Sequence, residues 1–457
     1  MVVCIQSQSI VIPSKPTPST KLFSLCEQIK LRTHAPLLYV YNPHKNISTF
    51  LETLRKSLSQ VLVIYYPIAG RLSWIKDGRW ELNCNAKGAI LLEAKCEANL
   101  KDLGDFVPNN LVSQLIPNIN YDVPIEDIPL LVVQLTRFRC GGFTLGVAFC
   151  RGAADGTAAM RFMSAWAKLA RGENLDSNDF PCHDRTLLIL HLHSEFEAPP
   201  KWIGQDLGDD TETSVVIMKL TREQVLKLKK NVSSRGSLQS TSKDVHKTKP
   251  FTSFEVIAGH IWRCVSKARY TRGNSDQPTR LSTLINCRNR LKPPLPSSYV
   301  GNTAFPTVTP TRSFNDLIRK PLRNAVEDVR AALERVTGEH VMSALDYIDR
   351  EKDMELLRYN FHYPAKSVCE EGQNKGNPNL FVVSWMNFSY KETDFGLGEP
   401  FYFGPGYMDS EGKAFVMNNN GDGDGIVVAI SLEASFMDVF KKIFYEDIEE
   451  VFCSSKL

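Results

Sequence analysis

The chain has 457 residues, 43% of them hydrophobic, and a formal net charge of +3 at neutral pH. This hydrophobic content excludes a disordered or fibrous protein, and the length favours two domains, because single hydrophobic cores rarely grow so large. The nearly balanced charge has no long run of one sign, so we expect no nucleic-acid partner.

The first half of the chain alternates between strand and helix patterns. β-Branched and aromatic residues predict strands in "SIVIPSKPTP" and "LLYVYN", and "STFLETLRKSLSQVLVIYYPIAGRL" predicts an N-capped amphipathic helix that ends at Pro67 and Gly70. Two apolar strands flank Gly141-Gly142 at the spacing of a hairpin. The segment "GTAAMRFMSAWAKLARG" then predicts a helix that ends at Gly172. This is the pattern of an α/β protein.

The second half repeats this order after a polar, Pro-bearing stretch at 174–213, which we interpret as a long connection. A strand in "TSVVIMKL" comes before "NVSSRGSLQSTSKDVHKTKP", which we interpret as a mobile loop. A helix follows in "FTSFEVIAGHIWRCVSKA", with Thr252 or Ser253 as its N-cap. A strand in "RLSTLINCRNRL" and a strand-helix unit in "GIVVAISLEASFMDVFKKIFYEDI" complete a second α/β domain.

Four motifs occur in order: "YYPIAGRLSW", "CRGAADG", "INCRNRLKPPLPSSYVGN" and "SWMNFSYKETDFGLGEPFYFGPG". As a set they resemble the plant BAHD acyltransferases, in particular the branch of spermidine and shikimate hydroxycinnamoyltransferase-like proteins, over nearly the whole chain. The resemblance implies two domains of chloramphenicol-acetyltransferase type, with an active-site channel between them that admits an acyl-CoA and the acceptor from opposite faces. We expect an N-terminal domain at 1–190, a crossover linker at 191–213 and a C-terminal domain at 214–457.

The catalytic motif of that family is H-x-x-x-D-G, in which the His takes a proton from the acceptor as it attacks the thioester. The matching residues here place Arg151 where the family has its base, whereas Asp155 and Gly156 agree with the motif. The resemblance implies that Asp155 points away from the channel and supports the loop. We expect its carboxylate to pair with an Arg of "NCRNRL", Arg288 first and Arg290 second.

A second family signature, D-F-G-W-G, corresponds here to Asp394, Phe395, Gly396, Leu397 and Gly398. In the family it lies far from the chemistry and supports the fold, so the resemblance gives Asp394, Gly396 and Gly398 structural roles. Leu397 replaces the Trp by another apolar side chain, a change that affects packing more than chemistry.

Arg151 cannot serve as a general base, because a guanidinium stays protonated up to about pH 12 and a base works best with a pKa near the working pH. Its fixed cation and planar donor fork suit a carboxylate, a phosphate or a developing oxyanion. Three hypotheses stay open. The protein transfers an aromatic acyl group from acyl-CoA to an amine or alcohol without the usual base; it runs a CoA-independent elimination, lyase or cyclisation reaction in which Arg151 binds a carboxylate; or it is not catalytic.

Other candidates concern the substrate. His34 and His362 lie in stretches that border the channel in the family, so each is a candidate for binding substrate or for supplying the base. Ser384 and Trp385 are further candidates for substrate binding. His260 lies on a predicted helix, where a packing role is the more common one, and we expect it to belong to the core.

Acyl-CoA is the co-substrate that the resemblance implies, and no tightly bound cofactor is expected. In the family the pantetheine and phosphates lie near the start of the helix that matches "KPFTSFEVIAGH", where this chain has Lys249, Thr252 and Ser253. A helix N-terminus with hydroxyls and a Lys is a good anion site. The alternative is that Thr252 or Ser253 only caps the helix. We interpret "GDGDG" at 421–425 as a hairpin turn, since no Lys-Ser/Thr on a helix follows it.

The eleven cysteines form no C-x-x-C pair and no Cys/His cluster at zinc spacing, so we expect no metal site. The first residues lack a charged region followed by an apolar one, as a secretory signal would have. No apolar run approaches the roughly 20 residues that cross a bilayer. We therefore expect reduced thiols in an intracellular protein without a membrane span, acting as a monomer on small-molecule substrates.

The last three residues, Ser455, Lys456 and Leu457, spell the S-K-L address that the peroxisomal import receptor recognises. We expect import into the peroxisome, with the cytoplasm as the alternative. A fluorescent protein fused to the N-terminus should give puncta that coincide with a peroxisomal marker. The signal should become diffuse when Leu457 is deleted, and a diffuse signal from the intact tail would contradict the prediction.

Overall fold

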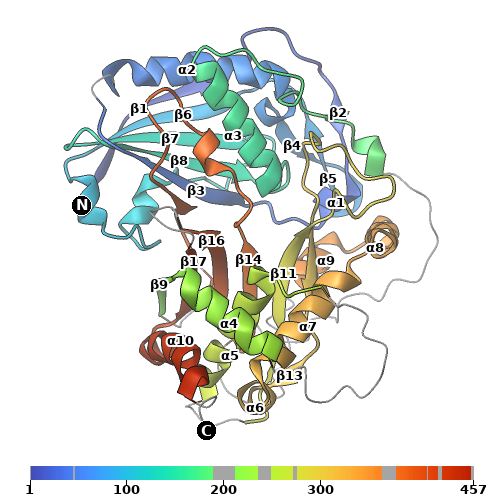
Figure 1. Ribbon diagram of the computed structural model, residues 1–457. Helices are drawn as coiled ribbons and strands as arrows, with labels where there is room; N and C mark the ends of the chain where they lie inside the picture. Colours follow the sequence, from blue (N-terminus) through green and yellow to red (C-terminus); the bar gives the residue numbers. More distant parts are fainter. Residues whose placement is uncertain are drawn as a thin grey trace.

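The computed structural model describes residues 2–44, 47–188, 212–234, 249–270, 275–362, 377–408, 410–419 and 425–453. They form two α/β units, each built on a six-stranded sheet with helices packed against it (Figure 1). Most of the predicted linker, most of the predicted mobile loop and the terminal tripeptide lie outside the described residues.

The sheet of the N-terminal unit has the order β1-β6-β7-β8-β3-β15. Its strands are β1 (Val3–Val11), β6 (Ala89–Cys96), β7 (Leu131–Phe138), β8 (Phe143–Cys150), β3 (His34–Tyr41) and β15 (Tyr402–Pro405). The antiparallel pairing of β7 with β8 confirms the predicted hairpin. Both strands are buried along almost their whole length because both faces of the sheet are covered.

Two helices cover one face of this sheet, α2 (Ile47–Ile64) and α3 (Gly156–Ala170), as predicted. The first ends earlier than predicted, at Ile64, and a separate 3-10 helix at Tyr66–Ala69 leads to Gly70. The apolar side chains of α2 and α3 share one core with the alternate residues of β8 and β3. Residues between 96 and 119 pack against the opposite face. A small sheet of β2 (Lys21–Leu22), β5 (Trp80–Asn83) and β4 (Arg71–Trp74) and the short helix α1 (Leu25–Gln28) complete the unit.

The sheet of the C-terminal unit has the order β12-β11-β14-β16-β17-β9. Its strands are β12 (Ala304–Val308), β11 (Leu281–Asn286), β14 (Leu380–Ser384), β16 (Lys413–Asn418), β17 (Ile426–Glu433) and β9 (Thr213–Leu220). The helices of this unit are α4 (Arg222–Ser234), α5 (Ser253–Tyr270), α6 (Phe314–Arg319), α7 (Leu322–Arg335), α8 (Gly338–Arg350), α9 (Met354–His362) and α10 (Ala434–Cys453). A two-stranded ladder joins β10 (Pro278–Thr279) to β13 (Arg312–Ser313).

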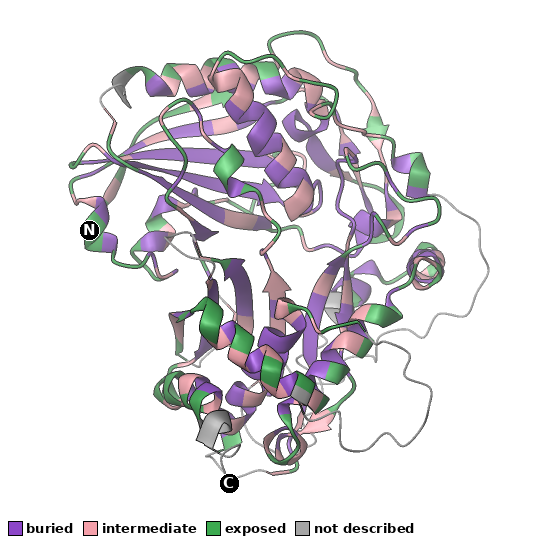
Figure 2. Cartoon of the chain, viewed as in Figure 1, coloured by how far each residue is buried: buried purple, intermediate pink, exposed green. Residues whose placement is uncertain are grey.

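Side chains of β16 alternate between two cores, as the two-residue period of a strand requires. Ala414 and Val416 face the helices of the C-terminal unit, whereas Phe415 and Met417 belong to the core of the N-terminal unit. The central strands of both sheets are largely buried, whereas the edge strand β1 and the outer faces of the helices are mostly exposed (Figure 2). β16 and β17 are antiparallel neighbours, as expected of strands that flank a hairpin turn, although most of the predicted turn lies outside the described residues.

β15 crosses the boundary that the sequence predicts between the domains. It lies in the C-terminal half of the chain but pairs with β3 in the N-terminal sheet. Phe403 of β15 packs on Tyr39 and stacks on Tyr390, with ring centroids 4.9 and 5.4 Å apart. Figure 1 shows this segment in orange, beside β3 and α3 of the upper unit. The predicted domain boundaries at 190 and 214 therefore do not account for β15, a strand from the C-terminal half of the chain that joins the N-terminal sheet.

His260 lies in the core between α5 and α10, as predicted. It is 1% exposed, and its Nε2 lies 2.8 Å from the carbonyl oxygen of Phe444. Burial lowers the pKa of His260 to about 4, so the imidazole is neutral at physiological pH.

Among the described helices, none has the length and apolar content of a membrane-spanning segment.

The close approach of β8 to the segment that covers it gives a prediction. A Cβ at Gly146 would lie 1.9 Å from the carbonyl oxygen of Leu115, so the backbone itself would have to move. Gly146→Ala should therefore lower the free energy of unfolding by more than Gly172→Ala. Gly172 has open space around it and a φ of +77°, so only backbone strain of about 1–2 kcal/mol is expected there. Equal losses in urea unfolding would contradict this packing.

Candidate active site

The loop at 151–154 joins the end of β8 to the start of α3, and its first residue is fixed by both units. The backbone N–H of Arg151 donates to the carbonyl oxygen of Thr33 at 3.0 Å. The side-chain amide of Asn302, from the C-terminal unit, donates to the carbonyl oxygen of Arg151 at 2.7 Å. Arg151 is partly exposed. Both backbone polar groups of Arg151 are therefore engaged, which fixes the point from which its side chain extends.

His34 begins β3, opposite Cys150 at the end of β8. Its Nε2 lies 2.8 Å from the carbonyl oxygen of Pro129, so Nε2 carries a proton, because a carbonyl only accepts. The backbone N–H of His34 donates to the Tyr121 hydroxyl oxygen at 2.9 Å, and this oxygen lies 2.8 Å from Nδ1. The Tyr121 hydroxyl therefore donates to Nδ1. Burial lowers the pKa of His34 to about 4, with a further contribution from the Arg151 cation.

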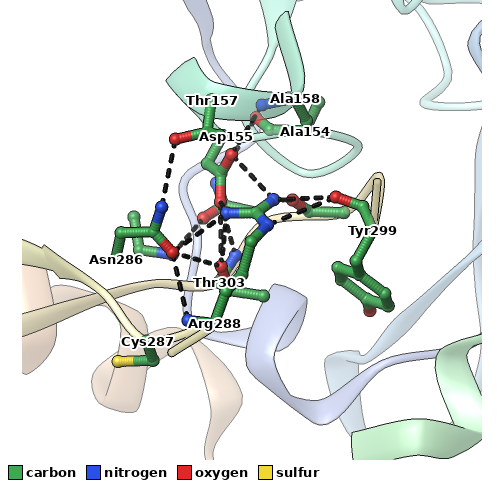
Figure 3. A network of polar contacts seen from close by, with 12 residues as sticks. Ala154, Asp155, Thr157, Ala158, Asn286, Cys287, Arg288, Tyr299 and Thr303 are labelled. Carbon is green, nitrogen blue, oxygen red and sulfur yellow. Dashed lines mark hydrogen bonds and ion pairs between the residues drawn. The ribbon is translucent and has the colours of Figure 1, made fainter. Parts of the chain in front are cut away.

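Asp155 lies at the centre of the polar network in Figure 3. Its Oδ1 caps α3 by accepting from the backbone N–H of Ala158 at 2.9 Å. Arg288 donates to both carboxylate oxygens, at 2.7 and 3.1 Å, and Thr303 donates to Oδ2 through its backbone N–H and its hydroxyl, at 2.9 and 3.1 Å. The Arg288 and Asp155 side chains are 4% and 5% exposed. The expected pair of Asp155 with Arg288 is thus present.

The charge state of Asp155 follows from these contacts. Burial raises the pKa of the carboxyl, but the Arg288 guanidinium and the hydrogen bonds from Ala158 and Thr303 outweigh it, so the net shift is downward. The carboxylate is ionised at neutral pH and its lone pairs are occupied by donors. This arrangement supports a structural role and leaves Asp155 without the means to act as the base.

Arg290, the second choice for the partner of Asp155, lies elsewhere. Its guanidinium donates to the carbonyl oxygens of Leu333 and Val336, both at 2.6 Å, at the end of α7. It therefore satisfies carbonyls that the end of a helix leaves without partners. The two-residue spacing from Arg288 directs the two side chains to different parts of the unit.

A second buried ion pair extends the network. Glu27 and Arg185 lie 3.0 Å apart and each side chain is 3% exposed. Glu27 also accepts from the backbone N–H of Asn302 at 3.2 Å. The Tyr299 ring lies between two guanidinium groups, 5.3 Å from that of Arg185 and 5.8 Å from that of Arg288. Buried charged side chains are therefore found from Asp155, which caps α3, to Glu27 of α1. Glu27 also holds Asn302, whose side chain contacts the carbonyl oxygen of Arg151.

Gly156 begins α3 at a point where no side chain would fit. A Cβ there would lie 2.2 Å from the ring of Phe388. Phe388 belongs to an aromatic group around Trp385, whose ring centroid lies 5.6 Å from Phe388, 5.5 Å from Phe403 and 4.5 Å from Phe415. The start of α3 is therefore packed against the segment that returns from the C-terminal unit.

The substrate candidates are dispersed. Trp385 is 9% exposed and packs in the core between the units, and Ser384 ends β14 as a half-buried residue. His362 ends α9, and its side chain lies outside the described residues. Of these candidates, His34 is placed beside Arg151 by the pairing of β3 with β8.

The start of α5 is closed by a capping box. The backbone N–H of Glu255 donates to the Thr252 hydroxyl oxygen at 3.2 Å, and the Thr252 N–H donates to the Glu255 carboxylate at 2.6 Å. Arg330 pairs with Glu255 at 2.8 Å and donates to the carbonyl oxygen of Lys249 at 2.6 Å. Thr252 is therefore the cap and Ser253 is the first helical residue. A role for Lys249, Thr252 and Ser253 in CoA binding stays a prediction.

The second signature forms a tight turn. Asp394 Oδ1 accepts from the backbone N–H groups of Gly396 and Gly398 at 2.7 and 2.9 Å. Both glycines have positive φ, +94° and +96°, a conformation that other residues rarely adopt. Phe395 is buried and meets Trp166 of α3 edge-on at 4.9 Å. Leu397 is partly buried against the same core, so the turn fastens the returning segment to the N-terminal unit.

No pattern in the sequence predicts the contact of Tyr121 with His34. Tyr121 lies in an irregular segment between β6 and β7, where no periodicity predicts its neighbours. The contact between Asn302 and Arg151 is equally non-local, since 151 residues separate them. The motif "YVGN" marks Asn302 as part of the family pattern without indicating what it touches.

The Asp155–Arg288 pair gives a prediction about stability. Arg288→Ala leaves a buried carboxylate without its partner, so the free energy of unfolding should fall by about 3–5 kcal/mol. The matched control is Arg350→Ala, which removes an Arg that is 63% exposed and pairs with Asp346 one turn away; it should cost less than about 1 kcal/mol. Because the pKa of Asp155 is lowered on folding, the stabilisation should be present at neutral pH and lost as the pH falls. Equal losses in the two variants would contradict the prediction.

Comparisons with known proteins agree with this geometry. The model of the Transferase family matches residues 1–447. Hydroxycinnamoyl-CoA:piscidic acid hydroxycinnamoyltransferase of Actaea racemosa is 39% identical over 98% of this chain and 100% of that protein. Shikimate O-hydroxycinnamoyltransferase of Nicotiana tabacum is 35% identical over 97% of this chain and 99% of that protein. The crystal structure of vinorine synthase, at 22% identity, has the same fold, with a TM-score of 0.72 over 96% of both chains. The chain therefore belongs to the BAHD acyltransferases of the Transferase family.

Proposed function

We propose that this protein transfers an aromatic acyl group from its CoA thioester to an amine or hydroxyl group of an acceptor that carries a carboxylate, and that Arg151 binds this carboxylate. The observation that carries the proposal is the position of Arg151. It occupies the place where the BAHD motif has its base, and both of its backbone polar groups are engaged. A planar guanidinium that extends from a fixed point suits bidentate contact with a carboxylate.

The relatives support this acceptor class. Their names describe transfer to piscidic acid, to shikimate and, in a relative from Avena sativa that is 33% identical over 98% of this chain and all of that protein, to the nitrogen of 5-hydroxyanthranilate. Each of these acceptors is an acid, and both oxygen and nitrogen nucleophiles occur among them. All three relatives are named as hydroxycinnamoyltransferases, so a hydroxycinnamoyl-CoA is the first donor to test.

Positioning accounts for much of the rate that such an enzyme needs. A thioester is already activated, and holding the nucleophile against its carbonyl can supply about 7–11 kcal/mol of the barrier. A carboxylate bound to Arg151 would orient the acceptor, while the CoA portion is expected near the start of α5. Arg151 then contributes through binding and orientation rather than through proton transfer.

The proposal predicts how Arg151 variants respond to the acceptor. With a hydroxycinnamoyl-CoA and an aromatic amino acid or hydroxy acid as acceptor, Arg151→Lys should lower kcat/KM by about 10- to 100-fold, because the bidentate fork is lost while the charge stays. Arg151→Ala should lose more, with an unchanged unfolding temperature. Release of free CoA and formation of the conjugate are the measurements, and Arg350→Lys is the surface control.

A carboxamide analogue of the acceptor sharpens this test. Replacing the carboxylate should cost the parent protein as much as Arg151→Ala does, and should cost the Arg151→Ala variant almost nothing, since the two changes remove the same contact. Independent losses would contradict carboxylate binding. Arg151→His should raise the rate with neutral alcohols if the missing base limits them. Consumption of acids without release of CoA would instead favour the CoA-independent reaction.

A further inference from the structure

We propose that Tyr121 and His34 form a proton relay that takes the place of the absent base. In this relay the Tyr121 oxygen receives the proton of the attacking amine or hydroxyl, and the Tyr121 hydroxyl passes its own proton to Nδ1 of His34. The inference rests on the proposed acyl transfer and names the groups that accept its proton.

The hydrogen bonds around His34 fix the direction of the first proton transfer, from Tyr121 to His34. Nε2 lies 2.8 Å from the carbonyl oxygen of Pro129, which fixes the tautomer with the free lone pair on Nδ1. The backbone N–H of His34 occupies one lone pair of the Tyr121 oxygen at 2.9 Å, so the hydroxyl proton points to Nδ1, 2.8 Å away. The Tyr121 oxygen can then receive a proton only as it gives up its own.

Exposure explains why two residues are needed. His34 is 8% exposed and is covered by Tyr121 and Pro129, so a substrate does not reach its ring directly. Tyr121 is 42% exposed and can meet a substrate from outside. The pairing of β3 with β8 places His34 opposite Cys150, and Arg151 bonds to Thr33, so the relay and the proposed carboxylate anchor lie at the same ends of two neighbouring strands.

Other ionisable groups beside the loop are unsuited to accept the proton. The Asp155 carboxylate is saturated by donors from Arg288, Thr303 and the α3 backbone. Burial raises the pKa of the Cys150 thiol to about 12, so it is not a thiolate at neutral pH. Lys30 is 3% exposed and donates to a backbone carbonyl of the C-terminal unit.

The proton balance of the transfer is complete with these groups. As the bond between the acceptor heteroatom and the acyl carbon forms, the carbonyl electron pair moves to its oxygen, the acceptor proton moves to Tyr121, and the Tyr121 proton moves to His34. When the oxyanion collapses, the bond from carbon to sulfur breaks and its electron pair leaves with the CoA sulfur. The proton on His34 returns through Tyr121 to the thiolate, which leaves as free CoA.

Arg151 links the relay to the acceptor carboxylate. Burial and the Arg151 cation keep the His34 imidazole neutral, so its Nδ1 lone pair is available before the reaction. The same cation disfavours the imidazolium that the relay creates. A carboxylate bound to Arg151 cancels this charge, so protonation of His34 costs less when an acid is bound. The relay therefore favours acidic acceptors in the chemical step as well as in binding.

The test uses Tyr121→Phe, His34→Gln and the double variant of the full chain, with a hydroxycinnamoyl-CoA and an acid acceptor that the parent protein converts. Each single change should lower kcat by about 100-fold, with the KM for acyl-CoA unchanged, since general-base catalysis contributes at least that much. The double variant should be no slower than the singles, because the two residues act as one unit. Tyr65→Phe is the matched control: it removes a hydroxyl that donates to the carbonyl oxygen of Asp179 at 3.0 Å, and kcat should not change.

Three outcomes overturn the relay: an unchanged kcat in Tyr121→Phe, losses that multiply in the double variant, or a lower kcat that is accompanied by an equal rise in the KM for acyl-CoA. Tyr121→Phe alone decides the matter if His34→Gln does not fold, because Tyr121 lies at the surface and thermal unfolding reports on its integrity. A parent protein that releases no CoA with any acid acceptor overturns the proposed function and the relay together. Activity of the parent with an unimpaired Tyr121→Phe overturns only the relay.

Discussion

The ion pair between Asp155 and Arg288 is the contact on which the rest of the site depends. It joins the N-terminus of α3 to the end of β11, two elements of different units, in a place where both side chains are almost completely buried. Such a pair is stable only when every donor and acceptor is satisfied, and Thr303, Ala158 and the carbonyl of Tyr299 complete it. The loop that begins at Arg151 ends at this pair, so its geometry follows from how the two units meet.

Arg151, at the position that the motif assigns to the base, sets the electrostatics that the proposed function depends on. Imidazole would exchange a proton, whereas a guanidinium stays charged. Burial lowers the pKa of the neighbouring His34, and the Arg151 cation adds to this shift. In the proposed function, a negative charge on the acceptor compensates that cation, which makes the acceptor part of the electrostatic balance of the site. The proposed relay would then couple binding of an acid to acceptance of its proton, although the two steps use different residues.

The strand β15, which the C-terminal half of the chain contributes to the N-terminal sheet, helps to fix the position of the two units relative to each other. Its pairing with β3 and the stacking of Phe403 on Tyr390 fill the space between the sheets with aromatic rings rather than with charges. The turn at Asp394 ties the same segment to α3. Apolar packing therefore joins the units through β15, and polar contacts join them through the Asp155–Arg288 ion pair and through the hydrogen bond from the Asn302 backbone N–H to Glu27.

The sequence by itself determined the local elements and the family, because hydrophobic periodicity, caps and ordered motifs are properties of neighbouring residues. It identified Arg151 as a departure from the motif for the same reason. The pairing of Asp155 with an Arg of "NCRNRL", 133 residues away, was predicted only through the resemblance to the family. Only the tertiary structure decided that β15 joins the other sheet, that Arg290 caps α7, and that Tyr121 and Asn302 reach His34 and Arg151. These contacts join residues far apart in the chain, and periodicity indicates that a strand is buried or a side chain polar without specifying which distant partner satisfies it.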